Sequence, residues 1–254
     1  MIRIKNETQI QGIQKSCDLL SELFDYLIPQ VKAGISTGKL DAIAKAFIDK
    51  HGGRPAFLGY YDYPASMCIS VNEEVIHGIP GKRELKDGDL VGIDCGIDLN
   101  GYFSDAAISV SVGQVSPQVE RLSRVTRECL DLAIAAAKPG ARVHDVSKAV
   151  YAHAKAAGYG VVRPYCGHGV GLALHEDPQV PNYVSAGPNP RLSPGMVIAI
   201  EPMINMGTDA IIDLDDGWTV VTADGLPSAH FEHTVLITKD GARPLTRWAL
   251  PGAV

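Results

Sequence analysis

Two aspartates stand inside apolar segments that have the character of β-strands. Asp94 follows the run VGI, and Asp105 precedes the run AAI. An ionised carboxylate that is buried without a partner costs several kcal/mol, so each of these side chains needs a cation or a dense set of donors. A surface turn would explain one such aspartate, but it explains two less easily. Whatever fold the chain adopts must bring a partner to both side chains.

Two glutamates pose the same problem in the second half of the chain. Glu201 lies in MVIAIEPMI and Glu232 in HFEHTVLIT, both of which are apolar, strand-like runs. The turn residues Asn100-Gly101 separate the two aspartates, so Asp94 and Asp105 fit neighbouring strands of one hairpin. The longer interval between the glutamates leaves room for other strands between them.

Four carboxylates that face one cavity would repel one another by about 4 kcal/mol per pair at 4 Å, even at an effective dielectric of 20. No lysine or arginine lies within three residues of any of the four acids. Two divalent cations would balance the charge. His168, within the glycine-rich CGHGVG, is the best candidate for an additional imidazole ligand. Carboxylates joined by one imidazole suit Mn, Fe, Co or Zn, and a metal pair that activates water predicts a hydrolase.

The other histidines divide into two groups. His77 in VIHGIP and His175 in LHEDP lie in motifs that suggest a function. A lone histidine is more often a capping or surface residue, and we interpret the remaining five in that way. They are His51, His144, His153, His230 and His233. The last two flank Glu232 and, on a strand, should point away from it.

Apolar periodicity predicts four helices. The stripe from Ile10 to Val31 recurs in steps of three and four, and a second helix follows the cap Ser36 or Thr37 and ends at Gly52-Gly53. A third begins at Ser116-Pro117, and a fourth spans about residues 143–158. The third should turn four apolar residues inward, namely Val119, Leu122, Cys129 and Leu132. Residues 67–112 are rich in valine, isoleucine and turn signals and predict antiparallel strands.

The order of elements occurs twice, since two helices lead into strands in each half. Short words repeat with it: KAG at 32–34 and KPG at 138–140 are 106 residues apart, and the two Arg-Pro pairs at 54 and 163 are 109 apart. We therefore expect an α+β fold in which two related halves, about 5–112 and 116–240, share one core. The simplest organisation is a single domain over 1–254.

The composition excludes several classes of protein. A formal charge of −6 lacks the basic excess of a nucleic-acid binder. The five cysteines form no C-x-x-C pair and favour a reducing compartment, so we expect a cytoplasmic protein. Neither a signal peptide nor an apolar run long enough to span a membrane is apparent.

Five motifs taken together resemble the signature set of the type I methionine aminopeptidases. They are VNEEVIHGIP, VGIDCGIDLNGYFSDAAIS, CGHGVGLALHEDPQV, PGMVIAIEPMI and HFEHTVLIT, and the likeness covers nearly the whole chain. The resemblance implies a pita-bread (creatinase/aminopeptidase) fold, with an antiparallel sheet flanked by two helix pairs in pseudo-twofold halves. It also implies co-translational removal of N-terminal methionine from nascent chains, with a preference for a small second residue.

The resemblance assigns roles to particular residues. It implies that Asp105 and Glu232 bridge two metals, that Asp94 holds one, and that His168 and Glu201 hold the other. Glu201 is similar to the family's general base, His175 to the residue that contacts the scissile carbonyl oxygen, and His77 to the residue that contacts the scissile nitrogen. Asn72 and Ser228 resemble residues at a monovalent-cation site.

An apolar pocket should hold the methionine side chain. Its candidate residues are Phe57, Tyr60, Tyr63, Cys68, Leu174 and Trp218, together with His77 and His175. Phe57 stands where the family usually has cysteine, and Leu174 where it usually has an aromatic residue. These two exchanges can compensate in volume, and both concern the limit placed on the residue after methionine.

Three relatives of the same fold are alternatives. A proline-specific aminopeptidase or prolidase shares the five ligand types but usually carries a preceding domain, whereas only about 60 residues precede the motifs here. A type II methionine aminopeptidase would carry a long helical insertion, and none is visible between His175 and Glu201. A metal-free binding relative should have lost ligands. We expect a monomer without direct nucleic-acid or membrane partners, and association with the ribosome as a partner.

Overall fold

The computed structural model describes residues 1–249, and its helices begin and end close to the predicted positions. Asn6 caps the first helix by accepting a hydrogen bond from the Gln9 amide, and Ser36 and Ser116 cap the second and third in the same way. The helices are α1 (Glu7–Leu27), α2 (Thr37–Lys50), α3 (Pro117–Ala136) and α4 (Val143–Ala156), with 3₁₀ turns η1 (Ile28–Gln30) and η2 (Tyr60–Asp62).

Within residues 1–249 the strands form one large antiparallel sheet and two small ones. The large sheet has the order β1 (Arg54–Pro55), β4 (Leu90–Leu99), β5 (Tyr102–Ser111), β14 (Glu232–Ile237), β9 (Val197–Ile200), β7 (Gly167–Gly169), β8 (Glu176–Val180), with β2 (Cys68–Val71) beside β4 and β15 (Ala242–Pro244) beside β14. The small sheets are β13 (Ser228–His230), β10 (Met203–Asn205), β6 (Gly160–Val161) and β11 (Ile211–Asp213), β12 (Val220–Thr222), β3 (Glu74–Ile76).

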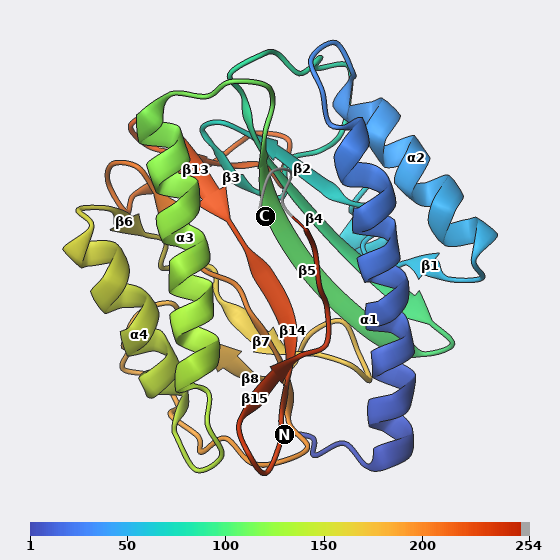
Figure 1. Ribbon diagram of the computed structural model, residues 1–254, viewed down its shortest axis with the longest axis vertical. Helices are drawn as coiled ribbons and strands as arrows, with labels where there is room; N and C mark the ends of the chain where they lie inside the picture. Colours follow the sequence, from blue (N-terminus) through green and yellow to red (C-terminus); the bar gives the residue numbers. More distant parts are fainter. Residues whose placement is uncertain (250–254) are drawn as a thin grey trace.

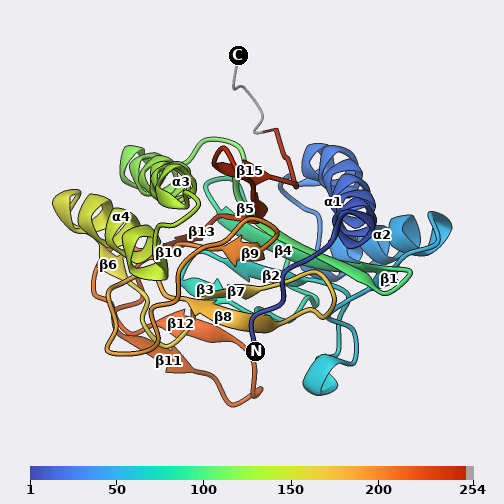
Figure 2. The same ribbon diagram turned by 90° about the horizontal axis from the view of Figure 1, so that it is seen from below.

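The two helix pairs cover the same face of the large sheet. Figure 1 shows α1 and α2 beside β4 and β5, and α3 and α4 beside the β6 and β13 end of the molecule. In the view of Figure 2 the four helices lie above the large sheet, while β11 and β12 of a small sheet lie below it. This arrangement leaves the face opposite the helices to loops and small strands, which can form a cavity.

The central hairpin joins β4 to β5 in the predicted way. Asn100 and Gly101 both have positive φ, 56° and 82°, as a two-residue type I′ turn requires. Its register places Asp94 opposite Ala107 and Gly96 opposite Asp105. The two aspartates therefore lie on adjacent strands, and β14 brings Glu232 opposite Ala107 on the other side of β5.

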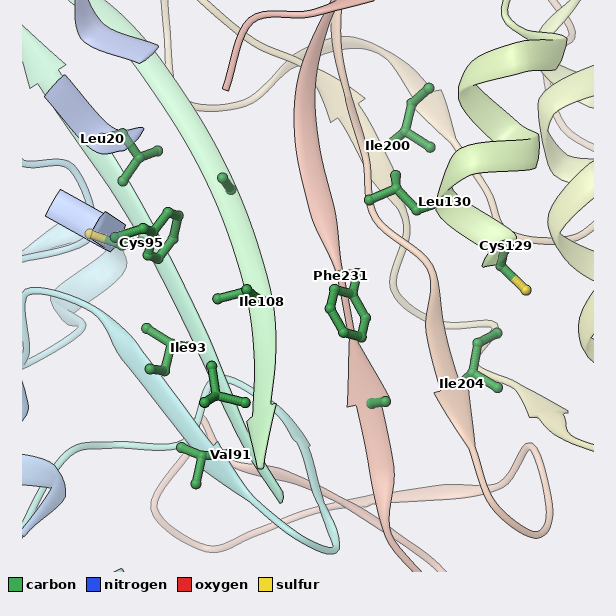
Figure 3. Packing of buried hydrophobic residues seen from close by; sticks show 14 of the residues in the cluster. Leu20, Val91, Ile93, Cys95, Ile108, Cys129, Leu130, Ile200, Ile204 and Phe231 are labelled. Carbon is green, nitrogen blue, oxygen red and sulfur yellow. The ribbon is translucent and has the colours of Figure 1, made fainter. Parts of the chain in front are cut away.

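The main core lies between the helices and the large sheet. Figure 3 shows Ile93 and Ile108 on β4 and β5, Phe231 near the start of β14, and Leu130 on α3, all nearly inaccessible to solvent. One sequence expectation is wrong here: Leu132 is 44% exposed, and its neighbour Ala133 is buried instead. The steps from Leu122 through Thr126 and Cys129 to Ala133 follow one side of α3, which Leu132 does not share.

None of the helices formed by residues 1–249 combines the length and the apolar character that a membrane crossing needs.

Candidate metal centre

The four acids and His168 meet at the floor of one cavity. Asp94 comes from β4, Asp105 from β5, His168 from β7 and Glu232 from β14, while Glu201 follows directly after β9. Three sets of three residues each have one ligand atom within 4.8 Å of the others. One consists of Asp105, His168 and His175, and the other two are Asp94, Asp105, Glu232 and His168, Glu201, Glu232. Glu232 belongs to both sets. Asp105 also approaches the second, because its Oδ2 lies 3.7 Å from His168 Nε2.

In the described part of the chain, these carboxylates lack cationic side chains, and several of their oxygens lack hydrogen-bond donors. The side-chain oxygens Asp94 Oδ1, Asp105 Oδ1 and Glu232 Oε1 are buried and have no hydrogen-bond partner in the described part of the chain. Across residues 1–249 no lysine or arginine pairs with any of the four acids. Buried polar atoms are normally satisfied, so orphaned oxygens from three different strands indicate ligands for a cation. The donor set therefore fits divalent metal ions.

The carboxyl groups of this cluster have raised pKa values, because burial and mutual repulsion disfavour their ionised forms. Burial raises the pKa of Asp94 to about 7, and burial together with the charge of Asp94 raises the pKa of Glu201 to about 8. Burial, followed by the neighbouring carboxylates, raises the pKa values of Asp105 and Glu232 well above their ordinary range. Cations placed among these groups would favour their ionised forms.

His168 is presented as a neutral ligand. Burial lowers its pKa to about 3, and its Nδ1 lies 3.0 Å from the carbonyl oxygen of Gly169. The carbonyl holds the hydrogen on Nδ1, because a carbonyl can only accept, so Nε2 carries the free lone pair. Nε2 faces Glu201 Oε1 at 3.5 Å. This is the arrangement that a metal-binding histidine requires.

His77 and His175 line the same cavity above the acids. His77 has a left-handed backbone, with φ of 59°, and burial lowers its pKa to about 4. A non-glycine residue rarely adopts this conformation, which concentrates at functional positions. His175 faces solvent within the cavity, its Nδ1 lies 2.8 Å from the Tyr60 hydroxyl, and desolvation by the surrounding protein lowers its pKa.

An apolar recess adjoins the histidines. Tyr63 and Cys68 are buried, and Phe57 and Trp218 pack against them. The Tyr63 hydroxyl donates to the carbonyl oxygen of Met67 or Gly78, at 3.2 and 3.0 Å, so its polar end is satisfied away from the recess. Phe57 and Leu174 both lie close to Gly96: a Cβ at Gly96 would lie 2.9 Å from Phe57 Cε1 and 3.2 Å from Leu174 Cδ1.

The structure brings the candidate catalytic, metal and substrate residues into one cavity of about 660 Å³, and it adds neighbours that the sequence did not indicate. These include Tyr61, Tyr165, Cys166, Asp177 and Gln179. Asn72 and Ser228 lie outside the cavity wall but next to each other, because the Ser228 amide donates to the Asn72 carbonyl at 2.8 Å.

His230 is the histidine for which the sequence expectation is wrong. It is buried and not a surface residue, and its Nε2 lies 3.9 Å from Glu201 Oε2. Residues two apart on a strand share a face, so the position of His230 two residues before Glu232 favours this side. Between β13 and β14 the Phe231 amide donates to the Pro202 carbonyl. His233 behaves as expected, since it stacks on Trp248 and its Nδ1 meets the Thr246 hydroxyl.

Comparisons with known proteins agree with this site. Residues 11–239 match the profile of Metallopeptidase family M24. A methionine aminopeptidase of Treponema pallidum (strain Nichols) is 55% identical over 97% of this chain and 96% of its own length, and methionine aminopeptidase 1 of Bacillus subtilis (strain 168) is 47% identical over 97% and 100%.

Solved structures give the same result. The crystal structure of methionine aminopeptidase from Rickettsia prowazekii superposes with a TM-score of 0.94 at 38% identity, covering 97% of this chain and 100% of that one. A prolidase from Pyrococcus furiosus superposes with a TM-score of 0.80 at 28% identity, and the match covers 97% of this chain but 66% of that one.

The fold and the carboxylate–histidine cluster together define a metallopeptidase. The fold is the pita-bread fold, an α+β arrangement of a curved antiparallel sheet and two helix pairs. The chain belongs to Metallopeptidase family M24 and, within it, to the type I methionine aminopeptidases.

Proposed function

We propose that this chain removes the N-terminal methionine from nascent proteins by hydrolysis, with two divalent cations and a preference for a small second residue. The observation that carries the proposal is the pair of overlapping ligand sets, which share Glu232 at the floor of a cavity with an apolar recess. A single cation could not neutralise four buried carboxylates. Two can, and they would lie on either side of Glu232.

The five ligand candidates divide between the cations by their positions. Asp94 would hold one cation, His168 and Glu201 the other, and Asp105 and Glu232 both. When bound, such a pair polarises the scissile carbonyl and lowers the pKa of a water nucleophile. Mn, Fe, Co and Zn all suit this donor set.

The protein's own residues then move protons and hold the peptide. Glu201, whose carboxylate lies at the cation site, takes the proton from the nucleophilic water and passes it to the leaving amine. The Tyr60 hydroxyl lies 2.8 Å from His175 Nδ1. In the tautomer that this mechanism uses, the hydroxyl would donate to Nδ1, and the hydrogen on Nε2 would be free to donate to the scissile carbonyl oxygen. His77, held in its left-handed conformation, contacts the scissile nitrogen and stabilises the tetrahedral state.

The apolar recess would bind the methionine side chain. Tyr63, Cys68 and Trp218 form its inner wall, and Phe57 and Leu174 close it above Gly96. A thioether chain suits such a wall because it is flexible and polarizable. The free amine of the substrate would lie at the Asp94 side of the cluster.

The remaining expectations belong to the same proposal. Residues 1–254 would form one catalytic domain with related halves, about 5–112 and 116–240. The protein would be a cytoplasmic monomer that meets nascent chains at the ribosome, and Asn72 and Ser228 would contribute to a monovalent-cation site. The adjacency of these two residues supports the last point.

The test is metal titration of the chelator-treated protein, combined with cleavage assays on Met-Ala-Ser, Met-Leu-Ser and Xaa-Pro peptides in parallel. We expect two equivalents of Mn²⁺ and fastest cleavage of Met-Ala-Ser. Faster cleavage of the Xaa-Pro peptides would favour a prolidase-like activity instead. Absence of both metal binding and cleavage would favour a binding protein.

His77→Ala tests the assignment of that residue. Because His77 is not among the candidate metal ligands, the variant should bind Mn²⁺ as the wild type does but lose most of its turnover, on the order of 100-fold or more. Normal hydrolysis by this variant would remove His77 from the mechanism.

A further inference from the structure

His230 is a buried imidazole for which the proposed mechanism has no role. It is the last residue of β13, its side chain is 4% exposed, and its Nε2 atom has no hydrogen-bond partner within residues 1–249. A buried polar atom left unpaired costs about 1–3 kcal/mol. Such a cost indicates a partner that reaches the ring only in another state of the site.

The nearest such partner is Glu201. Its Oε2 lies 3.9 Å from His230 Nε2, and its Oε1 lies 3.5 Å from His168 Nε2. The carboxylate therefore lies between two imidazoles. His168 belongs to a candidate metal set, whereas His230 belongs to none of those found in the described chain.

Hydrogen bonds fix the backbone position of His230. The Ser109 hydroxyl accepts a hydrogen bond from the His230 amide at 2.9 Å and lies 3.0 Å from the His230 carbonyl oxygen, to which it donates. Met203 is the antiparallel partner of His230 on β10. Ser109 is itself buried. These contacts fix the backbone of His230, so the imidazole and the Glu201 carboxylate can approach each other by rotation of side-chain torsions alone.

We propose that His230 is a positioning residue for Glu201: its Nε2–H donates to Glu201 Oε2 and thereby directs Oε1, together with His168, to the cation. A gap of 3.9 Å is too long for a hydrogen bond. Rotation of the carboxylate about its terminal torsion, which has a broad energy minimum, closes it. This inference rests on the proposed function, because it needs Glu201 to be a metal ligand.

Such a contact has two consequences. It satisfies the orphaned Nε2 of His230, and it fixes which Glu201 oxygen faces the cation. Partners that orient metal ligands in this way typically change metal affinity or activity by 10- to 100-fold when they are removed.

Two substitutions at this position separate hydrogen bonding from packing. His230→Gln keeps an N–H donor at a similar reach, whereas His230→Leu fills similar space without a donor. The matched control is His144→Leu on α4, which also removes a buried Nε2 without a partner in the described chain but lies outside the cavity.

The measurement is calorimetric titration of the chelator-treated proteins with Mn²⁺ alone. We expect His230→Leu to bind one of two equivalents about 10- to 100-fold more weakly, and His230→Gln to stay within about threefold of the wild type. The control should bind as the wild type does. Wild-type affinity in His230→Leu, or equal losses in both His230 variants, would overturn the inference. Failure of the wild type to bind Mn²⁺ would instead overturn the proposed function.

A crystal structure of the Mn²⁺-loaded wild type supplies a second readout that does not depend on how the variants fold. A distance of about 3.2 Å or less between His230 Nε2 and a Glu201 oxygen supports the inference. Separation beyond hydrogen-bonding distance in that structure overturns it.

Discussion

Two groups of buried carboxylates in this molecule differ in how they are compensated. Glu176, next to His175, is 3% exposed, and its Oε2 pairs with Lys5 Nζ at 3.0 Å, where Lys5 is 1% exposed. Its Oε1 accepts hydrogen bonds from the amides of Leu172 and Ala173 at 2.7 and 3.1 Å. The four acids of the metal centre meet no lysine or arginine in the same range of described residues, and three of their oxygens have no partner.

The difference teaches which buried charges serve the fold and which serve the chemistry. The chain itself supplies the partners of Glu176, namely the Lys5 ammonium group and two backbone amides. These contacts fix the loop that carries Leu174 and His175, and the carboxylate needs no added ligand. The acid cluster is tolerated only when something is added from outside. The two groups should therefore respond in opposite directions when a carboxylate is neutralised.

The largest effect is expected from Asp105→Asn. The variant loses a candidate bridging ligand, so kcat/KM for Met-Ala-Ser should fall by about 1000-fold or more, equivalent to several kcal/mol. In the metal-free state, folding near neutral pH requires the wild type to protonate Asp105, whose pKa burial and the neighbouring carboxylates raise well above its ordinary range. Asparagine is neutral in both states, so the metal-free variant should be more stable by about 1 kcal/mol or more. Peptide assays and thermal unfolding after chelation measure the two effects.

The control for this variant is Asp98→Asn on the adjoining strand β4. Asp98 pairs with Arg54 and accepts a hydrogen bond from the Gly101 amide, so neutralising it should lower stability and leave Mn²⁺ binding intact. If both asparagine variants destabilise the metal-free protein equally, the distinction between the two kinds of carboxylate is wrong.

Lys5→Met removes the positive partner of the buried Lys5–Glu176 pair. Removing one partner leaves Glu176 as an unpaired buried charge, which typically costs 3–5 kcal/mol. Thermal unfolding of the metal-loaded protein should report a melting temperature lower by about 10 °C, at 2–4 °C per kcal/mol for a chain of this size.

The double variant Lys5→Met/Glu176→Gln tests the cause. Without either charge, the amide oxygen at position 176 can still accept from Leu172 and Ala173, so most of the lost stability should return. Lys45→Met, which breaks an exposed pair with Asp49, serves as the control and should cost no more than about 0.5 kcal/mol. A double variant as unstable as Lys5→Met would show that the lysine stem, not its charge, matters.

The pH dependence of the metal-free protein follows from the raised pKa values. Asp94 and Glu201 have folded values of about 7 and 8, above their unfolded values near 4, so the folded state holds more protons between these limits. The unfolding free energy therefore falls as pH rises, by about 1.4 kcal/mol per pH unit for each carboxyl still protonated. The buried histidines, such as His168, act in the opposite direction but chiefly below about pH 6.5.

Thermal unfolding between pH 6.5 and 8.5 checks this expectation. The chelator-treated protein should lose stability across the interval, and saturating Mn²⁺ should abolish the loss because bound carboxylates stay ionised in the folded state. Equal stability at both ends for the metal-free protein would contradict the raised pKa values.

The sequence predicted those parts of the molecule that depend on local pattern. The helix starts at Ser36 and Ser116, the Asn100-Gly101 turn and the two aspartates on neighbouring strands all follow from local residue patterns, and the structure has them. Repulsion among unpaired acids was enough to predict a metal site before any comparison. The family resemblance then supplied the residue roles, which repulsion alone does not assign.

Long-range geometry could not be predicted in the same way. His230 Nε2 lies 3.9 Å from Glu201 Oε2, although the two residues are 29 positions apart, and nothing local to either residue predicts that approach. On α3 the small Ala133 is buried and Leu132 is exposed. Which side of a helix packs against the sheet depends on contacts with distant residues, and hydrophobicity alone favoured Leu132. The Lys5–Glu176 pair joins residues 171 positions apart, and nothing local to either residue predicts it.

The smallest effect is expected at the mouth of the apolar recess, where a substitution changes side-chain packing and no charge. Phe57 and Leu174 both lie close to Gly96, so Phe57→Cys creates space near Leu174 and leaves the four acids unchanged. A change of a few methylenes alters discrimination by about 1–3 kcal/mol, so cleavage of Met-Leu-Ser relative to Met-Ala-Ser should rise about 10-fold. Adding Leu174→Phe should reverse the gain by refilling the space. If the ratio of the two cleavage rates is unchanged in Phe57→Cys, Phe57 does not restrict the residue that follows methionine. Mn²⁺ affinity should be the same in all of these variants, because neither side chain belongs to the carboxylate cluster.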